Sequence, residues 1–126
     1  MEKVIYQAYP HFYKKMLEFL KENEVINECD VCFVGDSLTE MMDISYFKDY
    51  KCVNRGISSD KSAGILMTLD DRVIATRPKT IFMLIGSNDI CDGYTIKQIE
   101  RQSDKKVSSF SNSGKYICNY YKNILK

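Results

Sequence analysis

Short apolar runs that end at a glycine or a polar turn are the feature that most restricts how this chain can fold. The three runs span residues 31–34, 50–53 and 80–85. Each has the length of a buried strand, and a continuous apolar run is typical of a parallel strand with both faces covered. One helical segment precedes the first run, one lies between the second and third runs, and one follows the third. This alternation predicts an α/β fold in which helices cover both faces of a parallel sheet.

The helical segments are recognised by their spacing and end signals. Residues 12–24 form an amphipathic pattern, and the i, i+3, i+4, i+7 spacing predicts that its buried face consists of Tyr13, Met16, Leu17 and Leu20. Asp60 is the expected N-cap of a second helix, which Pro78 would end. Thr95 and Gln98 match a capping box that opens a further helix.

Length and charge limit the class of protein. A chain of 126 residues predicts one domain, and 44% hydrophobic residues are enough for a core. With 18 basic and 17 acidic residues the net charge is +1, which gives no argument for binding nucleic acid or an anionic membrane. No apolar run approaches the roughly 18 residues that span a bilayer. The first residues lack the apolar core of a signal peptide, so we expect a cytoplasmic protein.

The sequence contains five cysteines, and two of them have a CxxC spacing. An odd number of cysteines without a signal peptide favours reduced thiols over a disulfide framework. Cys29 and Cys32 would need a second pair or nearby histidines to bind a metal, and neither follows in the sequence. We therefore expect both to be buried as small apolar side chains, and we expect no metal or organic cofactor.

The composition changes after Arg101. Residues 102–114 are rich in serine, lysine and asparagine, which is typical of a loop or of disorder. Residues 115–126 are again partly apolar, and their periodicity leaves a strand and a short helix as alternatives. We therefore divide the chain into a partial α/β domain at 1–101 and a divergent, partly disordered tail at 102–126.

Three polar loops follow the three predicted strands. They are Gly35-Asp36-Ser37-Leu38-Thr39-Glu40, Asn54-Arg55-Gly56-Ile57-Ser58 and Gly86-Ser87-Asn88-Asp89. Ligands of parallel α/β sheets bind beyond the carboxyl ends of the strands, where these loops would meet. Each loop alone is ordinary turn chemistry. Their order and spacing together carry the functional hypothesis.

The three loops resemble the first three sequence blocks of the SGNH/GDSL family of serine ester hydrolases. The matching stretches are Phe33–Thr39, Val53–Ile57 and Ile85–Ile90, and the similarity covers about residues 10–100. The middle of the chain also resembles the bacterial branch similar to platelet-activating-factor acetylhydrolase subunits. The resemblance implies a three-layer α/β/α flavodoxin-like fold, here with a truncated parallel sheet and the strand order second–first–third.

The resemblance also implies a chemistry. Ser37 matches the family's nucleophile. Its own backbone N–H, the backbone N–H of Gly56 and the side-chain amide of Asn88 would form the oxyanion hole. Ester hydrolysis requires such a nucleophile and such donors. The expected partner is a small-molecule ester, whose acyl and alcohol groups the sequence does not identify.

One family block has no counterpart in this chain. The family's general base is a histidine in an Asp-x-x-His block near the C-terminus, whereas the one histidine here is His11. We therefore expect an impaired ester hydrolase, with a non-catalytic ligand-binding domain or a gene fragment as alternatives. His11 would lie at the same sheet edge as Ser37 and is either a relocated base or simply part of the segment that opens the first helix. Cys91 is an alternative nucleophile that would also need a histidine.

The third strand raises a question of association. Its outer edge could be covered only by the tail around residues 116–120. An uncovered apolar edge pairs readily with another chain. We therefore expect self-association through this sheet edge.

Overall fold

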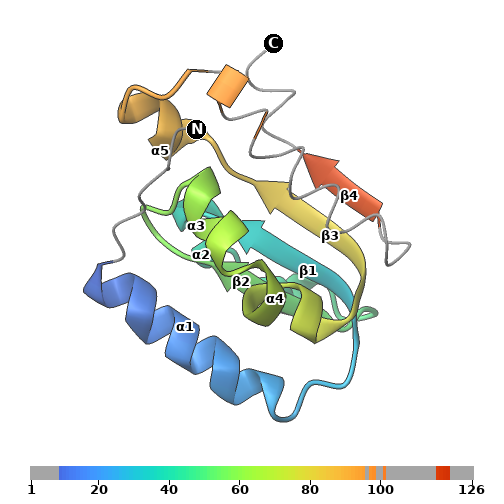
Figure 1. Ribbon diagram of the computed structural model, residues 1–126. Coiled ribbons are helices and arrows are strands. Elements are labelled where there is room, and N and C mark those ends of the chain that lie inside the picture. The colour runs from blue at the N-terminus through green and yellow to red at the C-terminus, as the bar shows by residue number, and fades with distance from the viewer. Residues whose placement is uncertain (1–8, 96, 99–100, 102–115, 120–126) are drawn as a thin grey trace.

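The computed structural model describes residues 9–95, 97, 98, 101 and 116–119 (Figure 1). Its sheet has the strand order β2-β1-β3-β4, and all paired strands are parallel. The strands are β1 (Cys29–Gly35), β2 (Cys52–Gly56), β3 (Pro78–Leu84) and β4 (Tyr116–Asn119). The predicted order second–first–third is confirmed, and the observed boundaries differ from the expected ones by a few residues.

Helices cover the sheet on both faces, as the alternating pattern predicted. They are α1 (Pro10–Asn23), α2 (Ser37–Glu40), α3 (Ser62–Met67), α4 (Leu69–Arg72) and α5 (Ser87–Cys91), with 3₁₀ turns η1 (Ile44–Tyr46) and η2 (Ile74–Thr76). The helix α1 packs on α4 (Figure 1), α2 packs on β1 and β2, and η1 packs on β2. The chain therefore has the expected layered α/β architecture.

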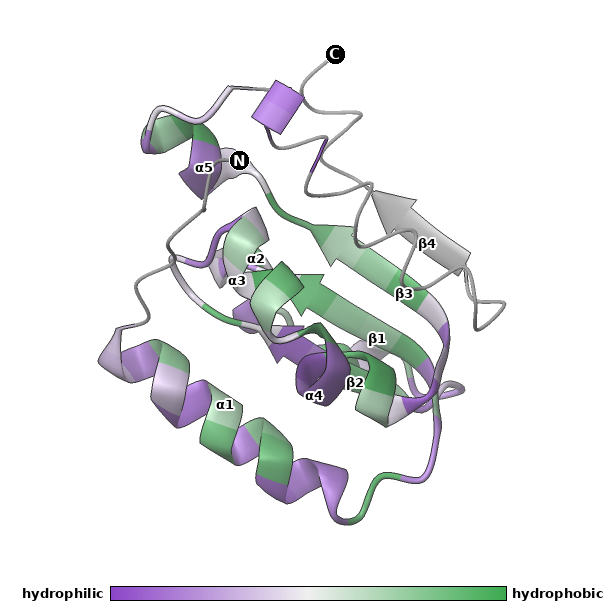
Figure 2. Ribbon diagram, in the orientation of Figure 1, coloured by the Kyte–Doolittle hydropathy of each residue, from purple (hydrophilic) through white to green (hydrophobic). Residues whose placement is uncertain are grey.

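The central strands carry the main core. Figure 2 shows β1 and β3 as hydrophobic along most of their length. Their inward side chains pack against the helices that follow β2, in a cluster made of Cys29, Cys32, Val34, Ile65, Leu69, Val73, Ile81, Met83 and Ile85. Because strand side chains alternate between faces, one set of positions faces α3 and α4. The other set, which includes Phe33 and Phe82, faces the opposite side.

That opposite face is aromatic and partly open. Phe33 stacks on Phe47 at a centroid distance of 5.4 Å and on Phe82 at 5.5 Å. Both Phe47 and Phe82 remain 41% exposed. An apolar cleft of about 160 Å³ lies on this face, lined by Phe33, Thr39, Met42, Phe82, Met83 and Leu84.

The buried face of α1 differs from the prediction. Tyr13 and Leu17 are 61% and 67% exposed, whereas Phe12 and Phe19 are buried. The arginine side chains beneath the helix explain the change, because aromatic rings bind guanidinium groups on their faces. Arg55 lies over the Phe19 ring at 4.6 Å, and Arg72 lies over the Phe12 ring at 6.0 Å. The prediction relied on the spacing of apolar residues along the helix and did not include the two arginines as packing partners.

The second predicted helix is also corrected. It divides at Thr68 into α3 and α4, followed by η2, rather than running unbroken to Pro78. The Thr68 hydroxyl donates to the Gly64 carbonyl at 2.7 Å, a contact that bends helices. The N-cap of α3 is Lys61, one residue later than expected, and Asp60 instead accepts the Lys61 backbone N–H.

The strand β4 pairs with the outer edge of β3. Its register places Tyr116 beside Thr80 and Asn119 beside Met83. Of the two structures left open for residues 115–126, the described part is therefore a strand. Residues 102–114, expected to be loop or disorder, lie outside the described residues. The outer edge of β3, through which we expect self-association, is paired with β4 over four residues.

The two cysteines of the CxxC spacing are buried, as expected. Cys29 and Cys32 are free thiols within the main core. Burial raises the pKa of Cys32 to about 12, so the thiol stays protonated and unreactive at neutral pH. In the part of the chain that the structure describes, no three histidine, cysteine or acidic side chains gather into a metal site. No helix among these same residues has the length and apolar character needed to cross a bilayer.

Candidate active site

The ends of β1, β2 and β3 are level with one another. Gly35, the last residue of β1, pairs with Gly56 on one side and with Leu84 on the other. The polar loops after these strands therefore begin at one edge of the sheet. The loop that carries Ser37, the end of β2 and the loop that carries Asn88 all lie at this edge.

The loop that carries Ser37 turns sharply from β1 into α2. Ser37 is the first residue of α2, and its N-cap Asp36 accepts the Leu38 backbone N–H at 3.2 Å. A Cβ atom at Gly35 would lie 2.3 Å from the Leu84 carbonyl oxygen and 2.4 Å from Thr39 Oγ1. Only glycine lets the strand end this close to its neighbours.

The backbone N–H of Gly56, which the sequence analysis assigns to the oxyanion hole, already has a partner within the protein. It donates to Asn54 Oδ1 at 2.9 Å. A Cβ atom at this position would lie 2.3 Å from the Glu40 backbone nitrogen. The glycine is therefore explained by the close packing of β2 against α2. Asn54 strengthens that packing by donating to the Thr39 carbonyl at 2.8 Å.

The third loop is fastened to the turn after β2. The Asn88 side-chain amide donates to the Asp60 carbonyl oxygen at 2.9 Å, which uses one of its two hydrogens. The next residue, Asp89, accepts from Ser62 through its backbone N–H at 3.0 Å and its hydroxyl at 2.7 Å. Within the same turn Ser59 has a positive φ of 67°. Asn88 is therefore fixed against the turn, with one N–H left to donate.

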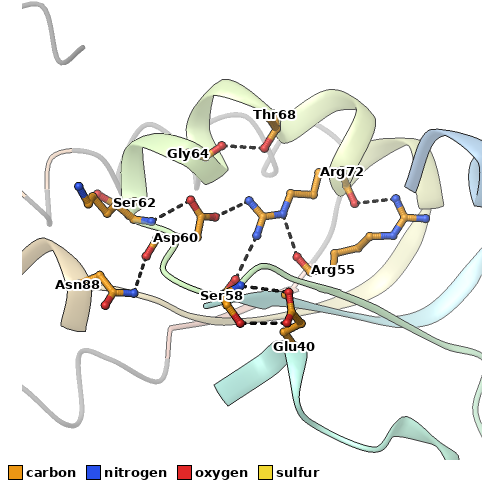
Figure 3. Close-up of polar contacts among 12 residues, drawn as sticks. Glu40, Arg55, Ser58, Asp60, Ser62, Gly64, Thr68, Arg72 and Asn88 are labelled. Carbon is orange, nitrogen blue, oxygen red and sulfur yellow. Dashed lines mark hydrogen bonds and ion pairs between the residues drawn. The ribbon is translucent and has the colours of Figure 1, made fainter. Parts of the chain in front are cut away.

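A buried arginine lies under this arrangement, and no sequence motif marks it. Arg72, at the end of α4, is fully buried and forms an ion pair with Asp60 at 2.5 Å (Figure 3). The sequence predicts Asp60 as a helix N-cap, and Arg72 resembles an ordinary solvated helix residue. A charge and its partner can be recognised as buried only when the helix orientation is known.

The acidic side chains near Ser37 are largely buried. Asp36, Asp60 and Asp89 are 4%, 0% and 2% exposed. Burial raises the pKa of Asp36 above its usual value, and the charges of Asp60 and Asp89 act in the same direction. A carboxylate with a raised pKa remains a poor base at neutral pH unless the shift is very large.

His11 is held by Glu40, which lies one helical turn after Ser37. His11 Nε2 lies 2.6 Å from Glu40 Oε1. The same carboxylate accepts the Ser58 backbone N–H at 3.1 Å and its hydroxyl at 2.9 Å (Figure 3). The Tyr9 hydroxyl also donates to the Ser58 carbonyl. The N-terminus of α1 thus lies at the expected edge of the sheet, tied to α2 and to the turn after β2.

The contacts of His11 bear on its role as a base. Among the described residues, no hydrogen bond joins Ser37 to His11. Burial alone would raise the pKa of Glu40, but hydrogen bonds from His11 and Ser58 outweigh burial and lower it. Glu40 therefore stays ionised at neutral pH and keeps the imidazole on its own carboxylate. Cys91, the other nucleophile considered, is exposed.

Several solved structures share this architecture. A platelet-activating-factor-like protein from Streptococcus pneumoniae is 23% identical, with a TM-score of 0.79 over 86% of this chain and 53% of its own. An acylhydrolase from Bacteroides fragilis is 20% identical, with a TM-score of 0.74 over 82% and 55%. A GDSL-like lipase from Bacteroides thetaiotaomicron is 19% identical, with a TM-score of 0.74 over 82% and 56%. Neither a protein-family model nor a curated protein matches the sequence.

These comparisons define the class of fold. The chain has the SGNH/GDSL hydrolase fold, as the three loops had implied. It spans a little over half the length of each of the three structures.

Proposed function

We propose that this chain is a serine ester hydrolase domain in which Ser37 attacks the ester carbonyl. The observation that carries the proposal is the meeting of the Ser37 loop and the Asn88 loop at one sheet edge, with Gly35 level with Leu84. Such a site places a nucleophile beside donors for the developing oxyanion. The similar structures include an acylhydrolase and a GDSL-like lipase, which supports this reaction class.

We assign two oxyanion donors to the resting site: the backbone N–H of Ser37 and the remaining side-chain N–H of Asn88. Gly56 would add a third only after Asn54 Oδ1 releases its N–H. Loss of one such donor typically lowers turnover by about 10²–10³-fold. Asn88→Ala is therefore expected to weaken acylation of Ser37 strongly.

The activity proposed for the 126-residue chain is weak. A serine hydroxyl needs a base to take its proton, and His11 is engaged by Glu40. In a serine protease, removal of the histidine costs about 10⁶ in turnover, while the oxyanion hole and binding leave about 10³–10⁴ over water. A residual rate of that order is the expectation here.

A second candidate function follows from the contact between His11 and Glu40. With His11 engaged elsewhere, the pocket would bind an ester or an acetylated ligand without turning it over. Calorimetric titration with a short ester that is not hydrolysed distinguishes this function, because binding would then occur without product.

The test is hydrolysis of p-nitrophenyl acetate by the wild type, Ser37→Ala and His11→Ala. We expect the wild type to release p-nitrophenol in an initial phase as Ser37 is acylated, and Ser37→Ala should lose this phase. The slow steady-state rate that follows should change little in either variant, because neither residue completes a catalytic triad. Turnover at tens per second that is lost in both variants would show instead that His11 is a relocated base.

A further inference from the structure

We propose that Arg72 is a positioning residue that fixes the three loops of the site relative to one another. The inference rests on the proposed function only in taking these loops as the ester-hydrolase site. Arg72 lies at the end of α4, within the layer that covers the sheet, and has no place in the sequence motifs. Its guanidinium points away from solvent toward the strand ends (Figure 3).

The guanidinium uses all three of its nitrogens. Nε donates to the Arg55 carbonyl at 2.8 Å, and Nη2 donates to the Gly35 carbonyl at 3.0 Å. Nη1 donates to Asp60 Oδ2 at 2.5 Å. A guanidinium is rigid and planar, so three contacts in different directions fix its acceptors in space.

Each acceptor belongs to a different part of the site. Gly35 immediately precedes Asp36 and Ser37, and its carbonyl also accepts the Ile57 backbone N–H at 3.0 Å. The Arg55 carbonyl belongs to the peptide that continues into Gly56. Asp60 carries the carbonyl that accepts the Asn88 amide. One side chain therefore contacts the nucleophile loop, the end of β2 and the residue that holds Asn88.

Fold stability alone does not account for this arginine. Burying an ion pair costs desolvation, and well-packed apolar residues often replace such pairs without loss of stability. An apolar side chain could fill the space between α4 and the strand ends, but it could not fix two carbonyls and a carboxylate in direction. Displacements of about 1 Å at a site can cost about 10²-fold in rate, so this directional role matters for chemistry.

Arg55 provides a matched comparison within the same molecule. It is as fully buried as Arg72, but its guanidinium points away from the loops. Nη2 donates to Asn23 Oδ1 at 2.9 Å, and Nη1 lies 3.4 Å from the carbonyls of Asp71 and Arg72. The Arg55 side chain therefore fastens α1 to α4, and only the backbone of this residue takes part in the site loops.

The experiment compares Arg72→Lys with Arg55→Lys in the full chain, in two independent arms. The first arm uses NMR to record the Asn88 side-chain amide signals and the hydrogen exchange of the Ile57 and Asp60 amides. The second arm measures the rate at which p-nitrophenyl acetate acylates Ser37. Thermal unfolding of both variants shows whether their stabilities match.

We expect Arg72→Lys to shift the Asn88 signals and to speed exchange at Ile57 and Asp60 by about ten-fold or more. It should slow acylation by about 10–100-fold, with little change in the ester concentration that gives half the maximal rate. Arg55→Lys should leave these signals and rates near those of the wild type. If the two variants change the same signals equally, Arg72 only stabilises the fold and the inference is wrong.

The two arms separate failure of the inference from failure of the proposed function. Without acylation in the wild type the proposed function fails, and the NMR arm alone decides the role of Arg72. Should Arg72→Lys not fold, Asp60→Asn replaces it. That variant keeps both carbonyl contacts of Arg72 and loosens only the turn that holds Asn88. It should shift the Asn88 signals, and unchanged signals would overturn the inference.

Discussion

Asp36 is the N-cap of the short helix α2, which begins at Ser37, and Glu40 is its last residue. The pKa values of these two carboxyl groups are shifted in opposite directions. Burial raises the pKa of Asp36, whereas hydrogen bonds from His11 and Ser58 lower that of Glu40 despite its burial. The two residues should therefore give opposite dependences of stability on pH.

For Asp36, ionisation is disfavoured in the folded state. Between its ordinary pKa of 3.8 and the higher folded value, the folded state holds more protons than the unfolded state, so stability falls as pH rises. Asp36→Asn removes this cost and can still accept the Leu38 N–H. We expect the variant to gain stability relative to wild type as pH rises from 3 to 7, measured by urea unfolding at several values. An unchanged difference across this range would contradict the assignment.

For Glu40, ionisation is favoured in the folded state. Its contribution is fully present above the ordinary pKa of 4.5 and is lost as pH falls through the lower folded value. Glu40→Gln should therefore be less stable than wild type at neutral pH, with the deficit shrinking on acidification through that window. Asp43→Asn is a matched control: its carboxyl also has a lowered pKa, but its partner is the exposed Ser45. Only Glu40→Gln should also change the NMR signals of His11.

The positions of Ser37 and Asn88 in the candidate site could be predicted from the sequence, but the contacts of Gly56 and Arg72 could not. The Ser37 and Asn88 loops follow apolar strands, and parallel topology alone brings strand ends to one edge. The engagement of Gly56 by Asn54 could not be predicted, because it depends on a side-chain rotamer at the strand end. The Arg72–Asp60 pair could not be predicted either, because the residues come from separate elements and look like surface charges in the sequence.

At the scale of elements, the strands β1, β2 and β3 were predictable, whereas β4 and the helix faces were not. Continuous apolar runs mark buried parallel strands directly, and their order followed from the family resemblance. The face of α1 depends on what lies beneath it, which is a pair of arginines rather than an aliphatic layer. The break at Thr68 likewise depends on one hydroxyl contact that helical periodicity does not reveal.

The helix α1 offers a direct test of its observed face. Phe19 is 1% exposed and packs on Arg55, whereas Leu17 is 67% exposed two residues earlier. Phe19→Ala should lower the free energy of unfolding by about 3–5 kcal/mol, because it leaves a cavity and an uncovered arginine. Leu17→Ala should change it by less than about 0.5 kcal/mol, as is usual at exposed positions. Equal effects in chemical denaturation would place the buried face where the aliphatic spacing put it.

At the scale of the whole molecule, β4 is the outermost strand beside β3 among the residues that the structure describes. This strand covers β3 over only four residues, Tyr116–Asn119. A chain ending at residue 101 lacks β4, so the backbone groups of β3 would be left unpaired along that edge. We expect it to self-associate in a concentration-dependent way in light scattering, because open strand edges pair with other chains.

A chain ending at residue 119 is the control for this deletion, because it keeps β4. It should associate less than the shorter chain at equal concentration. If the chain ending at residue 101 stays monodisperse, β4 does not protect the edge and the expectation is wrong.

The central claim is that Ser37 is a nucleophile beside an oxyanion donor. In a serine hydrolase the histidine also promotes the second step, in which water removes the acyl group. Without a free histidine, an acetyl group transferred from p-nitrophenyl acetate should therefore remain on the protein. The most direct measurement is peptide mapping by mass spectrometry after brief exposure to this ester, for the wild type, Asn88→Ala and the unfolded chain. We predict an acetyl group on Ser37 in the folded wild type, much less in Asn88→Ala and none in the unfolded chain. Equal acetylation of Ser37 in all three, or none in the wild type, would contradict the account.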